Sequence, residues 1–453
     1  MKEEFKILSA TAILGYGFPI ESFERGMAKK PDLIAVDAGS TDPGPYYLGA
    51  GVSFTDRNAV KRDLEIMIKA GLSNKIPVVV GTAGGSGANP HLNWCVEIVE
   101  EILSESSLSC RLAIIESELS HDRVKKALRE GKIQPLQYVP ELTETIIDET
   151  THIVAQMGTE PFIEAHKMGA DIIIAGRAYD PAVFAALPIM RGCDEALSLH
   201  IGKILECAAI CCTPGSGSDC MFGRIGEDYF ILEPLSDIRK CTTLSVSAHT
   251  LYEKTNPYIL PGPGGHLDLH DCSFTQHSEN SVKVMGTKFI PEKRATVKLE
   301  GARLIGYRTV SIAGTRDEIM ISNMDEIENA VKKRVEDNFK DKGFEYNLRF
   351  IVYGRDGVMG ENEPLKQTAH ELGIIIEATA KTQEQADTIC AFARSTMLHY
   401  GYTGRKSTAG NLAFPYSPSD LHAGEVFAFS IYHLMQISDD ENLFPVKILE
   451  IGG

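Results

Sequence analysis

The chain has 453 residues and a formal net charge of −17. Its length exceeds what one hydrophobic core usually holds, so we expect two or three domains. Its 43% hydrophobic and 24% charged residues are typical of a globular protein. The acidic balance disfavours nucleic acid and anionic membrane surfaces as partners, although it does not exclude a small anionic substrate in a locally positive pocket.

The N-terminus, MKEEFKILSA, carries acidic residues where an export signal needs positive charge, and no apolar run approaches about 18 residues. We therefore expect a cytoplasmic protein that does not contact membranes. The ten cysteines are too sparse and too unevenly spaced for a disulfide framework, and a reducing compartment would keep them as thiols.

The first 213 residues predict an α/β domain with a doubly wound, mostly parallel sheet. Apolar runs alternate with helical periodicity, which supplies the crossovers that parallel strands require. The predicted strands are Phe5–Ser9, Leu33–Val36, Pro77–Val80, Leu112–Ile115, His152–Ala155 and Asp171–Ala175. The predicted helices are Asp63–Ala70, Asn89–Leu103, Asp122–Arg129, Pro161–Met168, Pro181–Met190 and Glu195–Cys212.

The loop TPGSGSD, residues 213–219, is the clearest domain boundary by its turn composition. Beyond it, short Val, Thr and Ile runs between Pro and Gly predict an antiparallel sheet over residues 220–316. An α+β segment follows, with strands and helices predicted at Met324–Phe339, Asn347–Tyr353, Ile374–Thr379 and Gln383–Leu398. We therefore expect a second, β-rich α+β domain over residues 220–453.

The turn in PDLIAVDAGSTDPGPYYLG is the first candidate catalytic segment. Its polar side chains emerge at the carboxyl end of a buried strand, the edge where open α/β sheets bind ligands. Two carboxylates near one another can hold different pKa values, so Asp37 and Asp42 are candidate catalytic residues. Ser40 and Thr41 are candidate substrate ligands. An Asp-rich turn that merely caps backbone amides explains the pattern equally well.

A second candidate lies in VVVGTAGGSGANPHLNW, where a strand turns through a glycine-rich loop into a helix. Glycines let backbone amides approach a ligand, and a helix N-terminus favours an anion. The loop lacks the Lys-Ser/Thr of a P-loop and matches no dinucleotide fingerprint cleanly, and a plain tight turn is the alternative. The candidate substrate ligands here are Gly81, Gly84, Gly85, Ser86, Gly87 and Asn89.

Two further turns reach the same predicted edge. GRAYDP places Arg177 and Asp180 after the strand Asp171–Ala175, and the planar donors of Arg177 suit a substrate carboxylate. Asp180 is a candidate substrate ligand, although capping of the next helix explains it more simply. The strand Leu112–Ile115 delivers Glu116 to that edge as well. These groups converge on one cleft if the strands are ordered as supposed.

The cysteines at 207, 211 and 212, with another at 220, are a weak candidate for an iron–sulfur cluster. Their C-x3-C-C spacing is no standard ligand pattern, and buried cysteine commonly packs as a small hydrophobe. An oxygen-sensitive iron–sulfur hydro-lyase using Cys207, Cys212 and one other cysteine stays open as a third functional class.

In GGHLDLHDC, His266, Asp268 and His270 would lie on one face of a strand as possible metal ligands. Polar residues facing water show the same alternation and are the simpler explanation. His249 is a candidate acid or base, although a lone histidine is more often only hydrogen-bonded. No G-x-S-x-G or H-E-x-x-H motif occurs, which argues against common hydrolases and zinc proteases.

Several segments together resemble the acyclic terpene utilisation AtuA family over most of the chain. They are ILSATAILGYG, PDLIAVDAGSTDPGPYYLG, KRDL, IPVVVGTAGGSGA, GADIIIAGRAYDPA, ILECAA, SAHTLYEKTNP, VKLEGA and GYRT. The resemblance implies the breakdown of branched isoprenoid acids and other small organic acids, often as coenzyme A esters. Longer family members carry an additional small C-terminal domain, which a separate small subunit would replace here. Residues within the matching motifs are Asp37, Ser40, Asp42, the loop 81–87, Arg177, Glu206 and Cys207.

The sequence therefore predicts a lyase that hydrates or dehydrates a small branched unsaturated carboxylic acid, such as a methylfumarate-like diacid, or its coenzyme A ester. The alternative is a non-catalytic subunit that binds an organic acid or acyl-coenzyme A within an enzyme complex. The cofactor is left open; the coenzyme A moiety of the substrate is one candidate, and an iron–sulfur cluster or divalent metal is disfavoured. We expect a homo- or hetero-oligomer.

Overall fold

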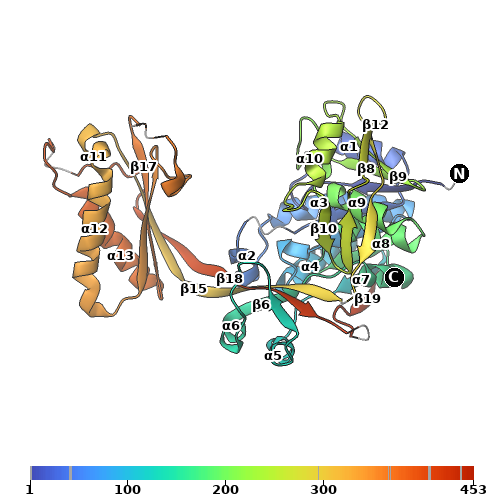
Figure 1. The fold of residues 1–453 in the computed structure, drawn as a ribbon, viewed down its shortest axis with the longest axis horizontal. Coiled ribbons are helices and arrows are strands. Elements are labelled where there is room, and N and C mark those ends of the chain that lie inside the picture. Colours follow the sequence, from blue (N-terminus) through green and yellow to red (C-terminus); the bar gives the residue numbers. More distant parts are fainter. Residues whose placement is uncertain are drawn as a thin grey trace. The chain divides into compact units, whose positions relative to one another are not determined.

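The structure is a computed structural model that describes residues 3–39, 43–293, 295–365, 367, 369–406, 410–438 and 441–452. It divides into two compact units, a larger one of Met1–Arg303 with Phe429–Gly453 and a smaller one of Leu304–Ala428 (Figure 1). Each unit is described by itself. The boundary predicted at residues 213–219 lies inside the larger unit, because strands on both sides of that loop belong to one sheet.

The larger unit is built on a sheet whose central strands are parallel. In spatial order its strands are β12 (Ser273–Gln276), β13 (Val282–Met285), β9 (Tyr229–Pro234), β8 (Met221–Ile225), β1 (Phe5–Ser9), β2 (Leu33–Asp37), β3 (Val78–Gly81), β7 (Ile172–Ala175), β4 (Cys110–Ile115) and β19 (Val446–Ile451). Neighbours from β1 to β4 pair parallel. The strands outside them pair antiparallel. The predicted α/β class is therefore confirmed.

Helices cover both faces of this sheet, because its central strands alternate side chains between two apolar layers. Ile7 and Leu33 belong to one buried cluster, whereas their neighbours Leu8 and Ile34 belong to the other. The helices on the first layer are α5 (His121–Arg129), α7 (Glu160–Lys167), α8 (Asp180–Met190) and α9 (Glu195–Leu205). Those on the second are α1 (Ile20–Ala28), α3 (Arg57–Asn74) and α4 (Asn89–Ser106).

Two predicted elements differ from the structure. The strand at His152–Ala155 forms, but it pairs antiparallel with β15 (Thr296–Thr315) instead of joining the parallel sheet. The predicted helix to Cys212 stops at Leu205, because Ala208 has a φ of 44°, a left-handed conformation that an α-helix cannot contain. The remaining elements of the larger unit are α2 (Tyr46–Ala50), η1 (Ala83–Gly85), β5 (Ile133–Pro135), α6 (Glu144–Glu149), β6 (Thr150–Ala155), η2 (Ala208–Cys211), α10 (Thr243–Thr250), β10 (Ile259–Gly262), β11 (Gly265–Asp268) and β14 (Lys288–Pro291).

The smaller unit is an α+β layer pair, as predicted for this part of the chain. Its strands β16 (Tyr346–Tyr353) and β17 (Leu372–Ala380) pair antiparallel with each other, and β17 pairs with β15. The helices α12 (Met324–Phe339) and α13 (Gln383–Leu398) pack against this sheet around a shared apolar core. The other elements are α11 (Glu318–Ser322), η3 (Lys340–Lys342), η4 (Gly360–Asn362) and β18 (Asp420–Gln436). The strands β15 and β18 both continue into the larger unit.

Phe162 of α7 is among the largest fully buried side chains of the larger unit. We expect Phe162→Ala to lower the free energy of unfolding by about 3–5 kcal/mol, because it removes apolar contacts and leaves a cavity. Urea unfolding followed by circular dichroism measures this. Val358→Ala is the control, since Val358 is 85% exposed and its loss should change stability by less than about 0.5 kcal/mol. Equal losses for both variants would contradict this core.

Candidate active site

A cavity of about 280 Å³ lies at the carboxyl ends of the parallel strands of the larger unit. Asp37 is the last residue of β2, Arg177 follows β7 by two residues, and Asp180 begins α8. The structure thus brings these three predicted residues to one cavity. Its lining consists of Ala12, Ile13, Tyr16, Asp37, Gly39, Pro43, Arg177, Asp180, Glu206, Cys207, Ile210, Tyr252 and Glu253.

Arg177 is buried and binds carboxylates of the chain itself. Its Nε and Nη2 donate to the two carboxylate oxygens of Glu300 at 2.7 and 3.3 Å, and its Nη1 donates to Asp180 Oδ1 at 3.2 Å. Lys298 Nζ lies 2.6 Å from Glu300 Oε1. Burial would raise the pKa of Glu300, but Arg177 and Lys298 lower it to about 2. Arg177 therefore mainly positions Glu300 and Asp180, and a substrate carboxylate would have to compete with them.

Asp37 is a buried carboxyl in which only one oxygen has a hydrogen-bond partner among the described residues. Only 4% of the surface of Asp37 is exposed. Oδ2 accepts a hydrogen bond from Gly39 N at 3.1 Å, whereas Oδ1 has no hydrogen-bond partner among the described residues. Burial raises the pKa of Asp37 well above its usual value, and the carboxyls of Asp180 and Glu206 raise it further, although Arg177 opposes them. Asp37 can therefore hold a proton where other aspartates are ionised.

Glu206 is the second carboxyl of the cavity with a raised pKa. Burial and the neighbouring Asp180 raise the pKa of Glu206 to about 8, although its ion pair with Lys203 lowers it. Lys203 lies on the preceding turn of α9, three residues earlier, so both side chains emerge on one helical face. A pKa close to the working pH suits a group that both accepts and donates protons.

The thiol and imidazole groups near the cavity are poor candidates for nucleophile or base. Burial raises the pKa of the Cys207 thiol, and Glu206 raises it further, so this thiol stays protonated. Burial lowers the pKa of His249 to about 4, and its ring stacks on Tyr252 with centroids 5.5 Å apart. The carboxyl groups are therefore the stronger acid–base candidates among the groups that line the cavity.

The other histidine candidates lie away from this lining. His270 Nδ1 lies 2.6 Å from Asp268 Oδ1, and the His270 ring stacks on Tyr258. His266 belongs to β11, which ends at Asp268, so the three predicted ligands do not share one regular strand.

The glycine-rich loop packs against the chain itself. Gly87 has a φ of 72°, and a Cβ there would lie 2.1 Å from Arg177 N. Ser117 joins the two turns, since its Oγ accepts from Arg177 N at 2.6 Å and donates to Gly87 O at 2.9 Å. A Cβ at Gly81 would meet Val183, and one at Gly84 or Gly85 would meet His91 or Phe54. The glycines therefore allow close packing behind the turn that carries Arg177.

A carboxylate of the chain already occupies the N-terminus of α4. Asn89 N donates to Glu118 Oε2 at 2.7 Å, and Glu118 Oε1 lies 2.7 Å from His152 Nδ1. Burial opposes ionisation of Glu118, but these two contacts lower its pKa overall. Glu118 thus takes the position that the sequence suggested for an external anion, while Glu116 is exposed.

The predicted substrate ligands of the glycine-rich loop are not among the described residues that line the 280 Å³ cavity. They are Gly81, Gly84, Gly85, Ser86, Gly87 and Asn89. The predicted residues Ser40, Thr41 and Asp42 lie outside the described part of the chain.

Sequence reasoning missed three residues of the charged cluster, Lys203, Lys298 and Glu300. Lys203 carries a usable signal, because it lies one helical turn before Glu206 in the ILECAA motif region. Lys298 and Glu300 lie in the motif VKLEGA, but nothing local links them to Arg177: Glu300 is 123 residues away and reaches Arg177 through the pairing of β15 with β6.

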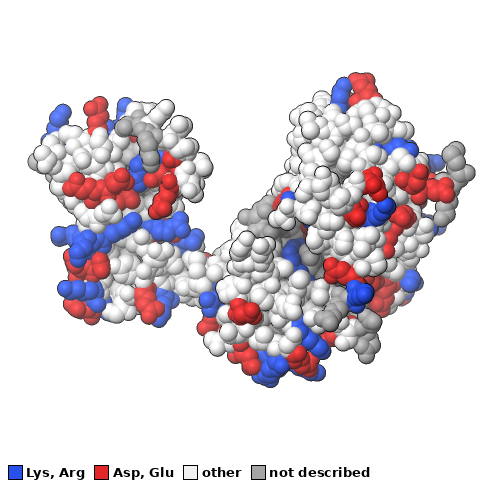
Figure 2. Space-filling model, viewed as in Figure 1, with Lys and Arg blue, Asp and Glu red and all other residues white. Residues whose placement is uncertain are grey.

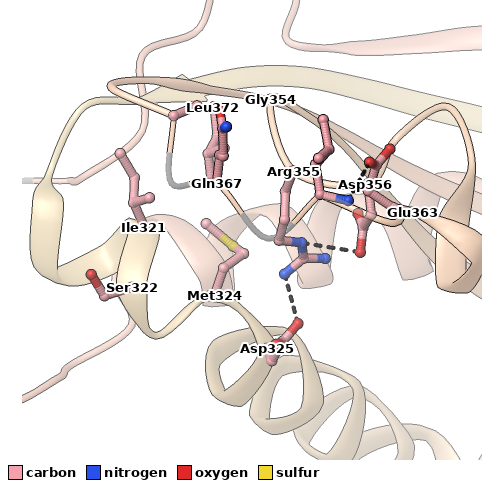
Figure 3. A pocket seen from close by; sticks show the side chains of 12 residues that line it. Ile321, Ser322, Met324, Asp325, Gly354, Arg355, Asp356, Glu363, Gln367 and Leu372 are labelled. Carbon is pink, nitrogen blue, oxygen red and sulfur yellow. Dashed lines mark hydrogen bonds and ion pairs between the residues drawn. The ribbon is translucent and has the colours of Figure 1, made fainter.

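A second cavity, of about 210 Å³, lies in the smaller unit (Figure 3). Arg355 points from its wall towards carboxylates, donating to Asp325 Oδ1 and Glu328 Oε1 at 2.7 Å each. Asp356 forms a third ion pair with it. Because this arginine is already matched by acidic groups and Asp325 is largely exposed, the cavity offers less for catalysis than the one around Asp37.

On the visible face of the larger unit, acidic and basic side chains are scattered among uncharged residues (Figure 2).

The fold and this cavity define an α/β protein that gathers buried acid–base groups at the carboxyl edge of a parallel sheet, where enzymes of this architecture bind their substrates. The chain belongs to the acyclic terpene utilisation family AtuA, whose pattern matches residues 56–220 and 231–418. The family has a catabolic role, which agrees with the resemblance seen in the sequence. Searches of curated proteins and of solved structures returned no match. Among the described residues, no helix combines the length and apolarity needed to cross a membrane.

The Arg177–Glu300 pair gives a test of the cluster. We expect Glu300→Gln to lower the free energy of unfolding at neutral pH by about 3–5 kcal/mol, because it leaves Arg177 buried with less compensating charge. The pKa of Glu300 is lowered from 4.5 to about 2, so its stabilisation is present above pH 4.5 and is lost as pH falls towards 2.

Urea unfolding at a series of acidic pH values measures both effects, and the Glu300→Gln variant should lose less stability than the wild type as pH falls. Glu292→Gln, at an exposed position, is the control and should follow the wild type. A Glu300→Gln variant with wild-type stability at every pH would show that the pair does not support the site.

Proposed function

We propose that this protein is a lyase that adds water to, or removes it from, a small branched unsaturated carboxylic acid or its coenzyme A ester. The observation that carries the proposal is the buried carboxyl of Asp37, whose Oδ1 has no hydrogen-bond partner among the described residues. This carboxyl lines a cavity beside a second carboxyl, that of Glu206. Two carboxyls in one cavity with raised pKa values suit paired proton transfers. A catabolic family gives the metabolic setting.

In the dehydration direction, Glu206 as carboxylate removes the proton next to the carbonyl while the Asp37 carboxyl donates its proton to the leaving hydroxyl. The C–H and C–O bonds break, the C=C bond forms, and water leaves. Asp37 then holds the charge that Glu206 held before, and a proton passes between the two neighbouring carboxyls to restore the starting state. Hydration follows the same path in reverse.

The cavity favours the ester over a free diacid. Its lining contains four carboxyl groups, Asp37, Asp180, Glu206 and Glu253, and one cation, Arg177, whose donors already bind Glu300 and Asp180. We expect an uncharged acyl thioester to fit this lining better than a substrate with two negative charges, because the donors of Arg177 already bind carboxylates of the chain itself. A volume of about 280 Å³ suits a small acyl group, since pockets for larger ligands begin at about 300 Å³.

The reaction is tested by following the ultraviolet absorbance of a panel of unsaturated acids and their coenzyme A esters, with the chain alone and with a co-expressed small subunit. We expect a falling signal with a branched ester. Asp37→Asn should reduce kcat by at least about 100-fold, because it removes the proton donor. Asp228→Asn, in the exposed turn between β8 and β9, is the matched control and should keep wild-type activity.

An Asp37→Asn variant that folds and retains full activity would remove Asp37 from the mechanism. If no substrate in the panel reacts while the folded protein binds one of them, the chain is a binding subunit for organic acids or acyl-coenzyme A, and the lyase proposal fails.

The role of Glu206 predicts a pH profile. Because Glu206 must be ionised to accept the proton and its pKa is about 8, kcat/KM for dehydration should rise as pH increases through this value. Glu206→Gln should abolish this rise along with most of the activity, whereas Glu227→Gln, at an exposed position, should keep it. If Glu206→Gln keeps activity and its kcat/KM rises with pH as in the wild type, the rise is caused by the ionisation of another group.

A further inference from the structure

Three buried cysteines bring their sulfur atoms together in the larger unit. Cys211 and Cys212 lie at the end of η2, and Cys241 lies just before α10. Their sulfurs all lie within 4.8 Å of one another, and Cys212 Sγ is 3.7 Å from Cys241 Sγ. In the described part of the chain, no other group of three His, Cys, Asp or Glu side chains approaches this closely.

The spacing fits one metal ion. Four ligands at about 2.3 Å around a tetrahedral centre lie about 3.8 Å from one another. Cys212 Sγ meets this distance twice, to Cys241 Sγ and to Met221 Sδ, at 3.7 Å each. In a [4Fe–4S] cluster each thiolate binds a different iron, which places the thiolates farther apart than these sulfur contacts. The structure therefore corrects the set considered from the sequence, in which Cys207 was a ligand: Cys207 faces the active-site cavity instead.

We propose that Cys211, Cys212 and Cys241 form a binding site for a single thiophilic d10 metal ion, with Met221 as an adjacent fourth sulfur. Three thiolates suit Zn²⁺, and three thiolates with a thioether suit Cu⁺. The shared chemistry is sulfur-only coordination in a closed, water-free environment. This inference does not depend on the reaction proposed for Asp37 and Glu206.

Such an ion would join η2, β8 and the segment before α10, and two of these segments lead to residues that line the candidate active-site cavity. Glu206 and Cys207 directly precede η2. Tyr252 and Glu253 come shortly after α10, the helix that begins after Cys241.

Ala208, the first residue of η2, has a φ of 44°. This left-handed conformation costs free energy for a residue other than glycine. A strained backbone conformation persists only where the surrounding structure fixes it. A metal ion bound between η2, β8 and the segment before α10 would fix the conformation of Ala208.

The site is tested on the full chain, purified and reduced without oxygen, stripped with a chelator, and titrated separately with Zn²⁺ and with Cu⁺. We expect one tightly bound equivalent of at least one of these ions. X-ray absorption of the loaded protein should show only sulfur ligands, near 2.3 Å for Zn²⁺. Loading should also raise the unfolding temperature, because the ion binds the folded chain.

We expect metal affinity to fall by at least about 100-fold in each of the variants Cys211→Ser, Cys212→Ser and Cys241→Ser. Loss of a residue that only orients a metal ligand already lowers the affinity about 10–100-fold. Cys390→Ser is the matched control, because Cys390 is also buried but lies in the smaller unit, and it should bind like the wild type. The wild-type absorption spectrum decides the question if the serine variants fail to fold.

Several outcomes would overturn the proposal. They are a reduced, folded wild type that takes up neither ion, nitrogen or oxygen ligands in the absorption spectrum, equal binding by the Cys212→Ser variant, and iron with inorganic sulfide in the native protein.

Discussion

The pairing of Arg177 with Glu300 is the interaction on which the candidate site depends. A buried charge is tolerated only when it is matched, and here the match comes from a strand that does not belong to the parallel sheet. The pair holds the turn after β7 against β15 and orients Asp180 towards the cavity. With that cation already occupied, Asp37 lies in a closed environment without a hydrogen-bonded cation among the described residues, which explains its raised pKa.

The burial that raises the pKa of Glu206 also makes the stability of the fold depend on pH. Glu206 has a pKa of about 8 in the folded chain and 4.5 ordinarily, so its contribution to stability is fully present below pH 4.5 and declines as pH rises through 8. At neutral pH the folded chain therefore favours the protonated forms of Asp37 and Glu206, which would be ionised in the unfolded chain. The proposed metal site begins at Cys211, shortly after Glu206 in the chain, and added rigidity there would help to keep the Glu206 carboxyl buried.

The sequence predicted the parallel strands well, because strands buried on both faces read as continuous apolar runs, and residues directly after them, such as Asp37 and Arg177, are fixed by the strand ends. Contacts between distant segments could not be read in this way. Glu300 reaches Arg177 from 123 residues away in the chain, through the pairing of β15 with β6. Glu118 fills the helix N-terminus because the carboxyl end of β4 lies beside the start of α4. Ala208 misled the prediction locally, since alanine favours helix but here adopts a left-handed turn.

The larger unit is discontinuous, since residues 304–428 separate its first part from Phe429–Gly453. During synthesis the edge of β4 is therefore exposed until the whole smaller unit has left the ribosome, because its antiparallel partner β19 comes last. An unpaired strand edge can pair with other chains. Until β19 is made, the nascent chain therefore carries an unpaired strand edge through which it can aggregate. Pairing of β19 with β4 covers that edge and completes the sheet of the larger unit.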